Sequence, residues 1–482
     1  MFATHAPTRC FPSIFVIVGG VVFFAATLIL HGGHVLNSDE GIVLNAAWQL
    51  WHGKEMYVDF FEYIPPGAAY LTYWTWHLID SPSYAAAKLL AIALFFISTA
   101  LIYLITRRLG GSRGASGAAA MLWLIASLFY PIINHNVYCS YAIIAMTLTL
   151  MLAAERRRSI LYMMAGSAGG IAFLFLQTKG LAALAAVILW IITSDETLTE
   201  RGRYLLCFLL GVILPLLTLL HWSASTLLYS LVFYPTTYYW RYGASALTAP
   251  VTIAAVLIAM VALILAWRTI KPSLKLLALV QAALILSSVT LLDWGHLIIN
   301  SFPLLIGAAL GWQWIVSRLP ATFTFWGYLI GITALGILSG LVIDKPLASL
   351  ASRNIYLPPV WAAPLDRLRL SPEFSAARYV YAGPFLPGLP FELKKPNPFF
   401  YSHLLVCGND CELATILTLK RLRPEYAAIA YPMVDRLGYE RTPVDHYISR
   451  TYTPCLEVST NSLAILAREP TLCPHDTASS KF

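Results

Sequence analysis

A series of long apolar segments, separated by short polar stretches, is the feature that most constrains this chain. A helix needs roughly 20 apolar residues to cross the roughly 30 Å hydrocarbon layer of a membrane. Of the 482 residues, 58% are hydrophobic and only 12% are charged, whereas about a quarter of an ordinary soluble chain is charged. Because the segments do not alternate in polarity, an outer-membrane barrel is excluded. We therefore expect an all-α polytopic membrane protein.

The apolar segments predict about eleven transmembrane helices, which are placed at 13–31, 83–106, 114–131, 138–153, 160–176, 181–193, 204–220, 250–267, 274–292, 297–317 and 323–343. A single helix over 160–193 would be about 51 Å long at 1.5 Å per residue, which is too long for a bilayer. We therefore predict two short helices, broken at Gln177-Thr178-Lys179-Gly180.

The basic residues predict the orientation in the membrane. The predicted inner loops contain many of them, including the run Arg156–Arg158, whereas the outer loops contain only Lys54, Lys179 and Arg241. This asymmetry places the N-terminus in the cytoplasm, with 13–31 as a retained signal anchor in the inner (plasma) membrane. The net charge of +8 is thus a topology signal, and no nucleic-acid partner is expected because no nucleic-acid module is present.

The chain is predicted to have two parts. Residues 1–343 form the transmembrane domain, which includes a long first outer loop at 32–82, and residues 344–482 form a periplasmic tail rich in proline and charge. The tail is long enough for a small α/β domain, with a predicted helix at Glu412–Arg423 and strands at Tyr379–Tyr381, His403–Val406, Ala427–Ala430 and Ser462–Ala467. Covering the outer cavity, binding an acceptor and merely stabilising the fold are all open roles for it.

Four of the seven cysteines lie in the tail, at Cys407, Cys411, Cys455 and Cys473. An even number of cysteines on the oxidising side of a membrane predicts disulfides, and the three possible pairings stay open.

The first outer loop is the most distinctive segment. Ser38 is a predicted N-cap for a helix over 41–51, which would place Asp39 and Glu40 at its positive end. The loop's aromatic residues are predicted to form a shelf at the membrane interface; they are Trp48, Trp51, Tyr57, Phe60, Phe61, Tyr63, Tyr70, Trp74 and Trp76.

Several motifs resemble the multi-spanning glycosyltransferases of the GT-C fold. They are the Asp39-Glu40 pair after the first span, the run 53–62 followed by Pro65-Pro66-Gly67, the stretch 293–296 (Asp-Trp-Gly-His), and the runs 379–387 and 396–398. The nearest branch is the family 39/83-like, polyprenyl-phosphate-sugar-dependent enzymes, which include bacterial dolichyl-phosphate-mannose-protein mannosyltransferase-like proteins. The resemblance implies that Asp39 is the catalytic carboxylate. The sequence departs from the family at Leu291-Leu292, where a basic residue often precedes the second acidic motif.

The chemistry of such a transfer agrees with the residues at the outer ends of the spans. Moving a sugar from a polyprenyl phosphate to the hydroxyl of a lipid, glycan or protein acceptor needs a carboxylate base. It also needs cations or hydrogen-bond donors for the departing phosphate. Asp39 is the candidate general base, and the candidate substrate-binding residues are Glu40, Glu62, Tyr57, Asp59, Lys179, Arg241, Asp293 and His296.

Each candidate also has a purely structural interpretation. Asp39 and Glu40 suit a helix cap, Lys179 suits a snorkelling cation, and Arg241 suits an interfacial anchor. Asp293 and His296 suit a hydrogen-bonded pair at a helix end, and Tyr57 and Asp59 suit a loop-shaping pair. Asn134-His135-Asn136 is interpreted as a plain polar turn.

No cofactor and no metal are expected. The carboxylates of the first loop suit Mg²⁺ or Mn²⁺ by oxygen ligation, but the chain has no Asp-x-Asp triplet there. The main rival interpretation is a transporter or flippase for lipid-linked glycans without catalysis, which predicts internal repeats and ionisable groups at mid-membrane. A noncatalytic scaffold and a ligase that transfers a whole glycan are further alternatives.

Overall fold

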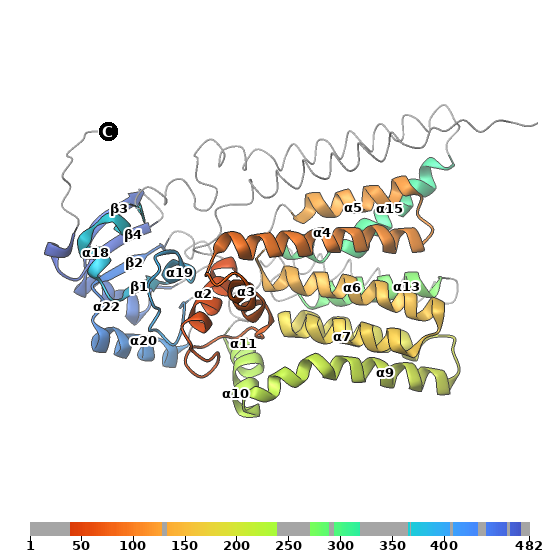
Figure 1. The fold of residues 1–482 in the computed structure, drawn as a ribbon, viewed down its shortest axis with the longest axis horizontal. Coiled ribbons are helices and arrows are strands. Elements are labelled where there is room, and N and C mark those ends of the chain that lie inside the picture. The colour runs from red at the N-terminus through yellow and green to blue at the C-terminus, as the bar shows by residue number, and fades with distance from the viewer. Residues whose placement is uncertain are drawn as a thin grey trace, which may run out of the picture.

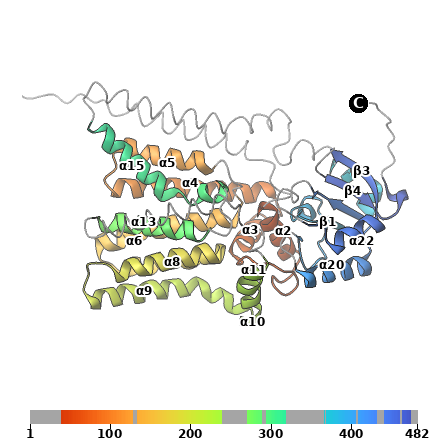
Figure 2. The same ribbon diagram turned by 180° about the vertical axis from the view of Figure 1, so that it is seen from behind.

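The computed structural model describes residues 39–127, 133–238, 270–288, 294–318, 365–366, 368–404, 408–431, 440–459 and 463–473. Within these ranges the molecule is elongated, with a bundle of apolar helices at one end and a small sheet domain at the other (Figures 1 and 2). Two helices of the first outer loop, α2 (Asp39–Trp51) and α3 (Gly67–Leu78), lie between them. The predicted spans 13–31, 250–267 and 323–343 lie outside the described residues.

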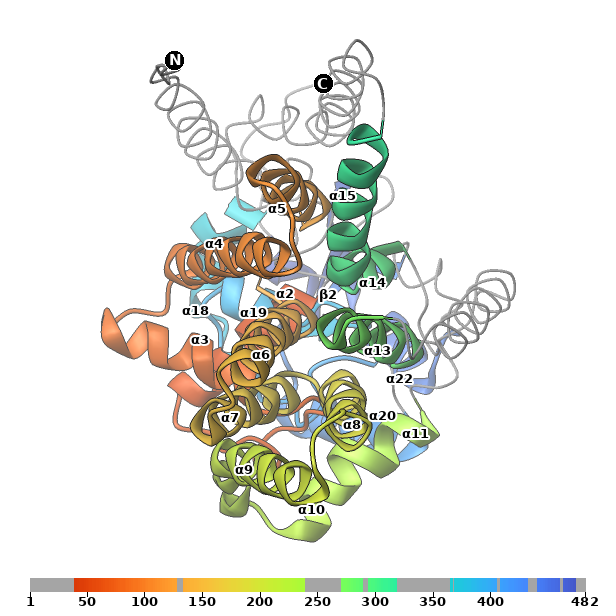
Figure 3. The same ribbon diagram turned by 90° about the vertical axis from the view of Figure 1, so that its right-hand side faces the viewer.

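The bundle consists of α4 (Tyr84–Arg108), α5 (Arg113–Ser127), α6 (His135–Arg156), α7 (Ser159–Phe175), α8 (Gln177–Ile192), α9 (Leu198–Leu216), α13 (Pro272–Leu286) and α15 (Phe302–Val316). Among the described residues, three helical stretches are long and apolar enough to cross a membrane, Tyr84–Arg108, His135–Arg156 and Leu198–His221. Viewed along the bundle, α6 lies between α4, α7, α8 and α13 (Figure 3). The mostly helical fold of a multi-spanning membrane protein is as predicted.

Short elements connect the bundle to the site region. They are η1 (Leu217–His221), α10 (Ala224–Leu228), the π-helical turn η2 (Tyr229–Phe233), α11 (Tyr234–Thr237) and α14 (Trp294–Ile299).

Helices α7 and α8 are separate, as predicted, but the break lies at Leu176 rather than at 177–180. Leu176 has an extended backbone, with φ −155° and ψ 113°, and Gln177 to Gly180 form the first turn of α8. Gly180 permits this tight reversal, because a Cβ there would lie 2.5 Å from Cα of Phe173. Because the break lies before Gln177, Lys179 belongs to the first turn of α8 rather than to a loop.

Helices α7 and α9 approach closely through glycines on both. A Cβ on Gly166 would lie 2.0 Å from the carbonyl oxygen of Phe208, and one on Gly211 would lie 1.9 Å from that of Met163. Small residues at such crossings let helix backbones touch, which is how helices pack when no hydrophobic force drives them together inside a membrane.

The first outer loop folds into α2 (Asp39–Trp51) and α3 (Gly67–Leu78). Its aromatic residues are mostly core rather than an interfacial shelf, so that prediction was wrong for Trp48, Tyr57, Phe60, Phe61 and Trp76, which are buried. They are covered by neighbouring elements, and Trp76 for example stacks on Phe391 of the tail at 5.2 Å. Trp74 alone among the shelf residues is largely exposed, at 59%.

The tail forms a four-stranded sheet in the order β1-β2-β4-β3. The strands are β1 (Val380–Gly383), β2 (Tyr426–Ile429), β3 (Thr453–Ser459) and β4 (Leu463–Ala467). Strands β1 and β2 are parallel, with Val380 opposite Tyr426, while β4 is antiparallel to both β2 and β3. The helical elements of the tail are α18 (Pro372–Ala376), α19 (Leu389–Glu392), α20 (Asn409–Leu422), α22 (Pro443–Thr451) and the 3-10 turn η5 (Pro470–Leu472).

Both faces of the tail sheet are buried, because alternate residues of a strand point to opposite faces. Tyr426 and Ala428 of β2 pack in one apolar cluster with Phe374 of α18. Ala427 and Ile429 pack in another with α20, α22 and Ile64 of the first outer loop. The face of the sheet that carries Ala427 and Ile429 therefore also packs against the first outer loop.

Three of the four predicted strands are present, as β1, β2 and β4, and the predicted helix is present as α20, as expected for a small α/β domain. The prediction of a strand at His403–Val406 was wrong at His403 and Leu404, which are irregular; the backbone N–H of Leu404 bonds to the carbonyl of Pro384, at 2.7 Å, rather than to a strand. Strand β3 was not predicted.

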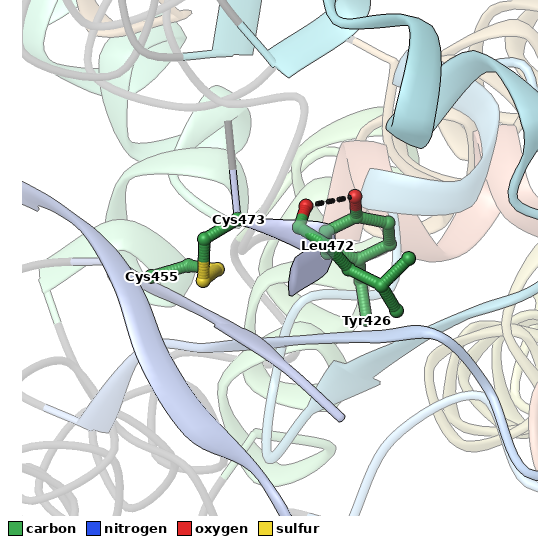
Figure 4. The surroundings of a disulfide bond; sticks show 4 residues. All are labelled: Tyr426, Cys455, Leu472 and Cys473. Carbon is green, nitrogen blue, oxygen red and sulfur yellow. Dashed lines mark hydrogen bonds between the residues drawn. A yellow bond between two sulfur atoms is a disulfide. The ribbon is translucent and has the colours of Figure 1, made fainter. Parts of the chain in front are cut away.

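The disulfide prediction is confirmed for Cys455 and Cys473, which are bonded to each other. This bond ties β3 to the end of η5, beside the hydrogen bond from the Tyr426 hydroxyl to the carbonyl of Leu472 at 2.6 Å (Figure 4). Cys411 is also disulfide-bonded, and Cys407 lies outside the described residues.

A seam of hydrogen bonds joins the tail to α2 and the loop after it. Trp48 Nε1 donates to the carbonyl of Lys395 at 2.9 Å, and Asn397 Nδ2 donates to Asn45 Oδ1 at 3.2 Å. Lys54 Nζ donates to the carbonyl of Asn397. The tail is therefore fixed on the first outer loop.

Candidate active site

Asp39 is the first residue of α2 and lies half-buried at the end of the bundle that faces the tail. A carboxylate is favoured there by the partial positive charge of the helix N-terminus. Asn134 Nδ2 donates to Asp39 Oδ2 at 2.8 Å. Asn134 is also the N-cap of α6, where its Oδ1 accepts from the backbone N–H of Asn136. One asparagine thus caps α6 and orients the carboxylate of Asp39.

Glu40 is fully buried and holds three parts of the chain together. Its Oε2 accepts from the hydroxyl of Tyr84 at 3.1 Å, and its Oε1 accepts from the backbone N–H of Ile133 at 3.3 Å. The charge of Glu40 also acts on the buried ammonium group of Lys88. Glu40 therefore fastens α2 to α4 and to the start of α6.

A group of basic side chains surrounds His135 at the start of α6. His135 lies in the electrostatic field of Asp39, His296 and Lys179. Lys179 is buried in the first turn of α8, where its Nζ donates to the carbonyl of Asn136 at 3.2 Å and to the hydroxyl of Ser140. Lys179 and His296, two of the candidate substrate-binding residues, and Asp39, the candidate base, therefore all act electrostatically on His135.

The interpretation of Asn134-His135-Asn136 as a plain polar turn was wrong. All three are buried at the beginning of α6, and His135 Nδ1 has no hydrogen-bond partner within the part of the chain that the structure describes. The turns that begin α4, α6 and α8 all lie at the end of the bundle nearest α2 (Figure 2), which is why residues far apart in sequence come close here. Arg241 and Asp293 lie outside the described residues.

Glu62 and Tyr57 lie together in the loop between α2 and α3. The Tyr57 hydroxyl donates to the carbonyl of Ile64 at 2.7 Å, and burial together with the charge of Glu62 raises the pKa of Tyr57 well above its usual value. Glu62 is 2% exposed, and burial raises its pKa from 4.5 to about 8. Glu62 is therefore protonated at neutral pH.

Asp59 has a local role in the same loop. It is exposed, and its Oδ2 accepts from the backbone N–H of Glu55 at 2.8 Å, which closes a turn. This hydrogen bond agrees with the loop-shaping interpretation of Asp59.

His403 is a site residue that the sequence did not reveal. It comes from the tail, is 9% exposed, and lies close enough to Asp39 to feel its charge. Burial lowers the pKa of His403 to about 4, against the opposing effect of Asp39, so its imidazole is neutral at pH 7. No spacing in the sequence links position 403 to position 39, since the contact depends on how the tail docks.

Among the residues that the structure describes, no group of three or more His, Cys, Asp or Glu side chains could hold a metal ion. The four carboxylates of the first outer loop whose chemistry suits Mg²⁺ or Mn²⁺, Asp39, Glu40, Asp59 and Glu62, form no such group.

Comparison with known proteins agrees with this architecture. The family model of dolichyl-phosphate-mannose-protein mannosyltransferases matches residues 64–222. The crystal structure of ArnT from Cupriavidus metallidurans bound to undecaprenyl phosphate matches with a TM-score of 0.59 at 14% identity, covering 97% of this chain and 99% of ArnT. This is the GT-C fold. An oligosaccharyltransferase from Archaeoglobus fulgidus, in complex with Zn and sulfate, matches the GT-C architecture with a TM-score of 0.51 at 13% identity, covering 96% of this chain and 74% of that one.

The oligosaccharyltransferase AglB from Archaeoglobus fulgidus, in complex with an inhibitory peptide and a dolichol-phosphate, also matches, with a TM-score of 0.51 at 13% identity, covering 97% of this chain and 75% of that one. No curated protein matches the sequence. These matches cover 96% to 97% of this chain and so include both the bundle and the tail.

Proposed function

We propose that this chain is an integral membrane glycosyltransferase that moves a sugar from a polyprenyl-phosphate donor to an acceptor hydroxyl outside the cytoplasm. The observation that carries the proposal is that His135, at the start of α6, lies in the electrostatic field of Asp39, Lys179 and His296, with Lys179 hydrogen-bonded to the carbonyl of Asn136. A carboxylate beside a group of cations and hydrogen-bond donors is what transfer from a phosphate needs.

In the proposed reaction, Asp39 acts as the general base. Its carboxylate takes the proton of the acceptor hydroxyl as that oxygen attacks C1 of the sugar. The bond between C1 and the phosphate oxygen breaks, and its electron pair leaves with the polyprenyl phosphate. The hydrogen bond from Asn134 to Oδ2 orients the carboxylate of Asp39.

Lys179 and His296 stabilise the negative charge that grows on the departing phosphate. Lys179 already donates to Asn136 and Ser140, so its ammonium group is held in place before a donor binds. A preorganised charge of this kind stabilises the transition state without reorganising when the reaction occurs. Arg241 is proposed as a further substrate-binding residue because it is a basic residue at the outer end of a predicted span, and Asp293 because of the resemblance of its motif.

Glu40, Tyr57 and Asp59 are proposed to support the site rather than to bind substrate. Glu40 uses both carboxylate oxygens within the protein, Tyr57 is bonded to Ile64, and Asp59 closes a turn. Their contribution is to position α2 and the loop that follows it.

The donor and orientation follow from the same proposal. The ArnT structure contains undecaprenyl phosphate and an AglB structure contains a dolichol-phosphate, and we propose a polyprenyl-phosphate sugar as the donor here. The distribution of basic residues between the predicted loops places the site on the outer side of the inner membrane. The acceptor is a lipid, glycan or protein of the cell envelope.

The test is a comparison of the envelope glycans and lipids of cells with and without this protein, followed by an assay of the purified enzyme. We expect one sugar to be missing from an envelope component. In nanodiscs, the protein should release undecaprenyl phosphate from an undecaprenyl-phosphate-linked sugar only when an envelope extract supplies the acceptor. An unchanged glycan profile, or accumulation of a lipid-linked sugar on the cytoplasmic side, would contradict transfer and favour transport.

A further inference from the structure

The two ring nitrogens of His135, the first residue of α6, lie in different surroundings. Its Nε2 lies 3.2 Å from Nδ2 of Asn136, whereas its Nδ1 is buried and has no hydrogen-bond partner within the described ranges of the chain. The whole side chain is 6% exposed. Buried polar atoms in native proteins nearly always have a partner, so we expect a partner for Nδ1 from outside the described residues.

The amide of Asn136 determines which of the two nitrogens carries the proton. An asparagine Nδ2 can only donate, so Nε2 of His135 accepts this hydrogen bond and has no hydrogen of its own. The charge of Asp39 favours an imidazolium, and the charges of His296 and Lys179 oppose it. An imidazolium would also place its Nε2 proton against the NH₂ group of Asn136. His135 is therefore a neutral ring whose single N–H donor is at Nδ1.

The surroundings of His135 favour a negatively charged ligand. It begins a helix of 22 residues, and the N-terminus of a helix carries a partial positive charge that attracts anions. Lys179, in the first turn of α8, adds a full positive charge, and its Nζ donates to the carbonyl of Asn136 at 3.2 Å. The starts of α6 and α8 lie at the same end of the bundle (Figure 2). An anionic oxygen is therefore the partner that suits the Nδ1–H group.

We propose that the Nδ1–H group of His135 donates a hydrogen bond to the phosphate of the polyprenyl-phosphate donor and keeps this bond as the phosphate departs. This role rests on the proposed glycosyl transfer, which supplies the phosphate. No proton is transferred in this contact, because the hydrogen stays on Nδ1 while negative charge grows on the phosphate oxygen. The hydrogen bond from Asn136 fixes the tautomer before the donor binds, and a preorganised donor of this kind stabilises such a charge without reorganising.

The first experiment measures the tautomer directly, on the full-length protein in nanodiscs with ¹⁵N-labelled histidine. The chain has 11 histidines, so the signals of His135 are assigned by their loss in His135→Asn. We expect a protonated Nδ1 and an unprotonated Nε2 at neutral pH. In Asn136→Asp, whose carboxylate accepts from Nε2, the proton should move to Nε2. A proton on Nε2 in the wild type overturns the proposal.

The second experiment measures binding of two probes by native mass spectrometry. They are undecaprenyl phosphate and undecaprenol, which has the same chain without the phosphate. His135→Phe keeps a ring and removes the N–H group, whereas His135→Asn places an amide N–H close to the position of Nδ1. His446→Phe changes an exposed histidine of the tail and is the matched control.

The expected result follows from the strength of a hydrogen bond to a charged group, which changes affinity about tenfold to a hundredfold. His135→Phe should bind undecaprenyl phosphate more weakly than the wild type by this factor. His135→Asn should stay within about threefold of the wild type and His446→Phe should be unchanged. The affinity for undecaprenol should be the same in all four proteins, because it has no phosphate.

A second variant keeps the test decisive should His135→Phe not give a monodisperse protein. His135→Gln places its amide near the position of Nε2 rather than of Nδ1, so it should lose affinity for undecaprenyl phosphate as His135→Phe does. Wild-type affinity in folded His135→Phe or His135→Gln overturns the proposal, since another group or a water molecule is then the partner of Nδ1. An equal loss of affinity for undecaprenol also overturns it, because that result indicates a merely structural role.

Failure of the proposed reaction looks different from failure of this contact. Phosphate-dependent binding that needs His135, without sugar transfer to any envelope acceptor, would leave the contact standing and remove the reaction. Sugar transfer by the wild type, together with unchanged binding of undecaprenyl phosphate in His135→Phe, would leave the reaction standing and remove the contact.

Discussion

Replacing Glu62 by glutamine should stabilise the protein by an amount that depends on pH. Glu62 is 2% exposed, and burial raises its pKa from 4.5 to about 8. Between these two pH values the folded protein keeps the proton while the unfolded chain loses it. Since stability falls with pH wherever the native state binds more protons than the unfolded state, Glu62 makes folding less favourable as pH rises from 4.5 to about 8.

The magnitude follows from the size of the shift. One pKa unit corresponds to 1.36 kcal/mol. Raising the pKa of Glu62 from 4.5 to about 8 therefore lowers the free energy of unfolding by about 5 kcal/mol at pH 8 and above, by about 3 kcal/mol at pH 7, and by nearly nothing at pH 4.5. Glutamine has nearly the same shape and cannot ionise. Glu62→Gln should therefore match the wild type near pH 4.5 and become progressively more stable than it up to pH 8.

The assay is thermal unfolding of both proteins in one detergent, followed by tryptophan fluorescence at half-unit steps from pH 4.5 to 8.5. Glu469→Gln, at an exposed position of the tail, is the matched control and should show no pH-dependent difference. A difference in melting temperature between Glu62→Gln and the wild type that stays constant with pH would refute the reasoning. A difference that widens toward acidic pH would refute it as well.

Three further predictions concern the base, the phosphate site and the packing of the fold. Asp39→Asn should lower kcat 10²- to 10⁴-fold, which corresponds to a barrier raised by roughly 3–5 kcal/mol, because it removes the proposed base but keeps its shape. Asp80→Asn, at an exposed position, is the control. Near-wild-type turnover by folded Asp39→Asn would mean that Asp39 is only a helix cap. Lys179→Ala should raise KM for the polyprenyl-phosphate sugar and lower kcat, since it removes the charge that is proposed to stabilise the departing phosphate. Unchanged steady-state kinetics would exclude that contact. Gly211→Val should destabilise the protein by several kcal/mol, since its Cβ would lie 1.9 Å from a backbone oxygen of α7 and overpacking costs typically 1–3 kcal/mol or more; a melting temperature equal to that of the wild type would contradict the close crossing.

Much of the bundle could be predicted from the sequence, because long apolar segments report directly on membrane helices. The separation of α7 from α8 followed from length alone, since a helix over 160–193 would not fit a bilayer. The exact break did not, because the reversal at Leu176 depends on how closely Gly180 packs against Phe173. Local sequence carries no signal for that contact.

The site was predicted less completely. Asp39, Lys179 and His296 stand out as polar residues at the ends of apolar helices, and such residues are rare enough to be noticed. His135 and His403 do not stand out, since one lies among asparagines that suit a turn and the other follows a run of aromatic residues that suits a strand. Their placement depends on the docking of distant elements, which a single sequence does not encode in any spacing.

The seam between the tail and the first outer loop has a consequence for biogenesis. Trp48 and its partner Lys395 are 347 positions apart in the chain, and a ribosome that adds 5–20 residues per second needs roughly 20 to 70 s to cover that distance. During this time the surfaces of Trp48 and Trp76 that pack on the tail are not yet covered by it. The end of the molecule that holds the proposed site is therefore completed last, so a chain truncated before the tail is expected to keep its bundle helices but expose an unfinished, protease-sensitive surface.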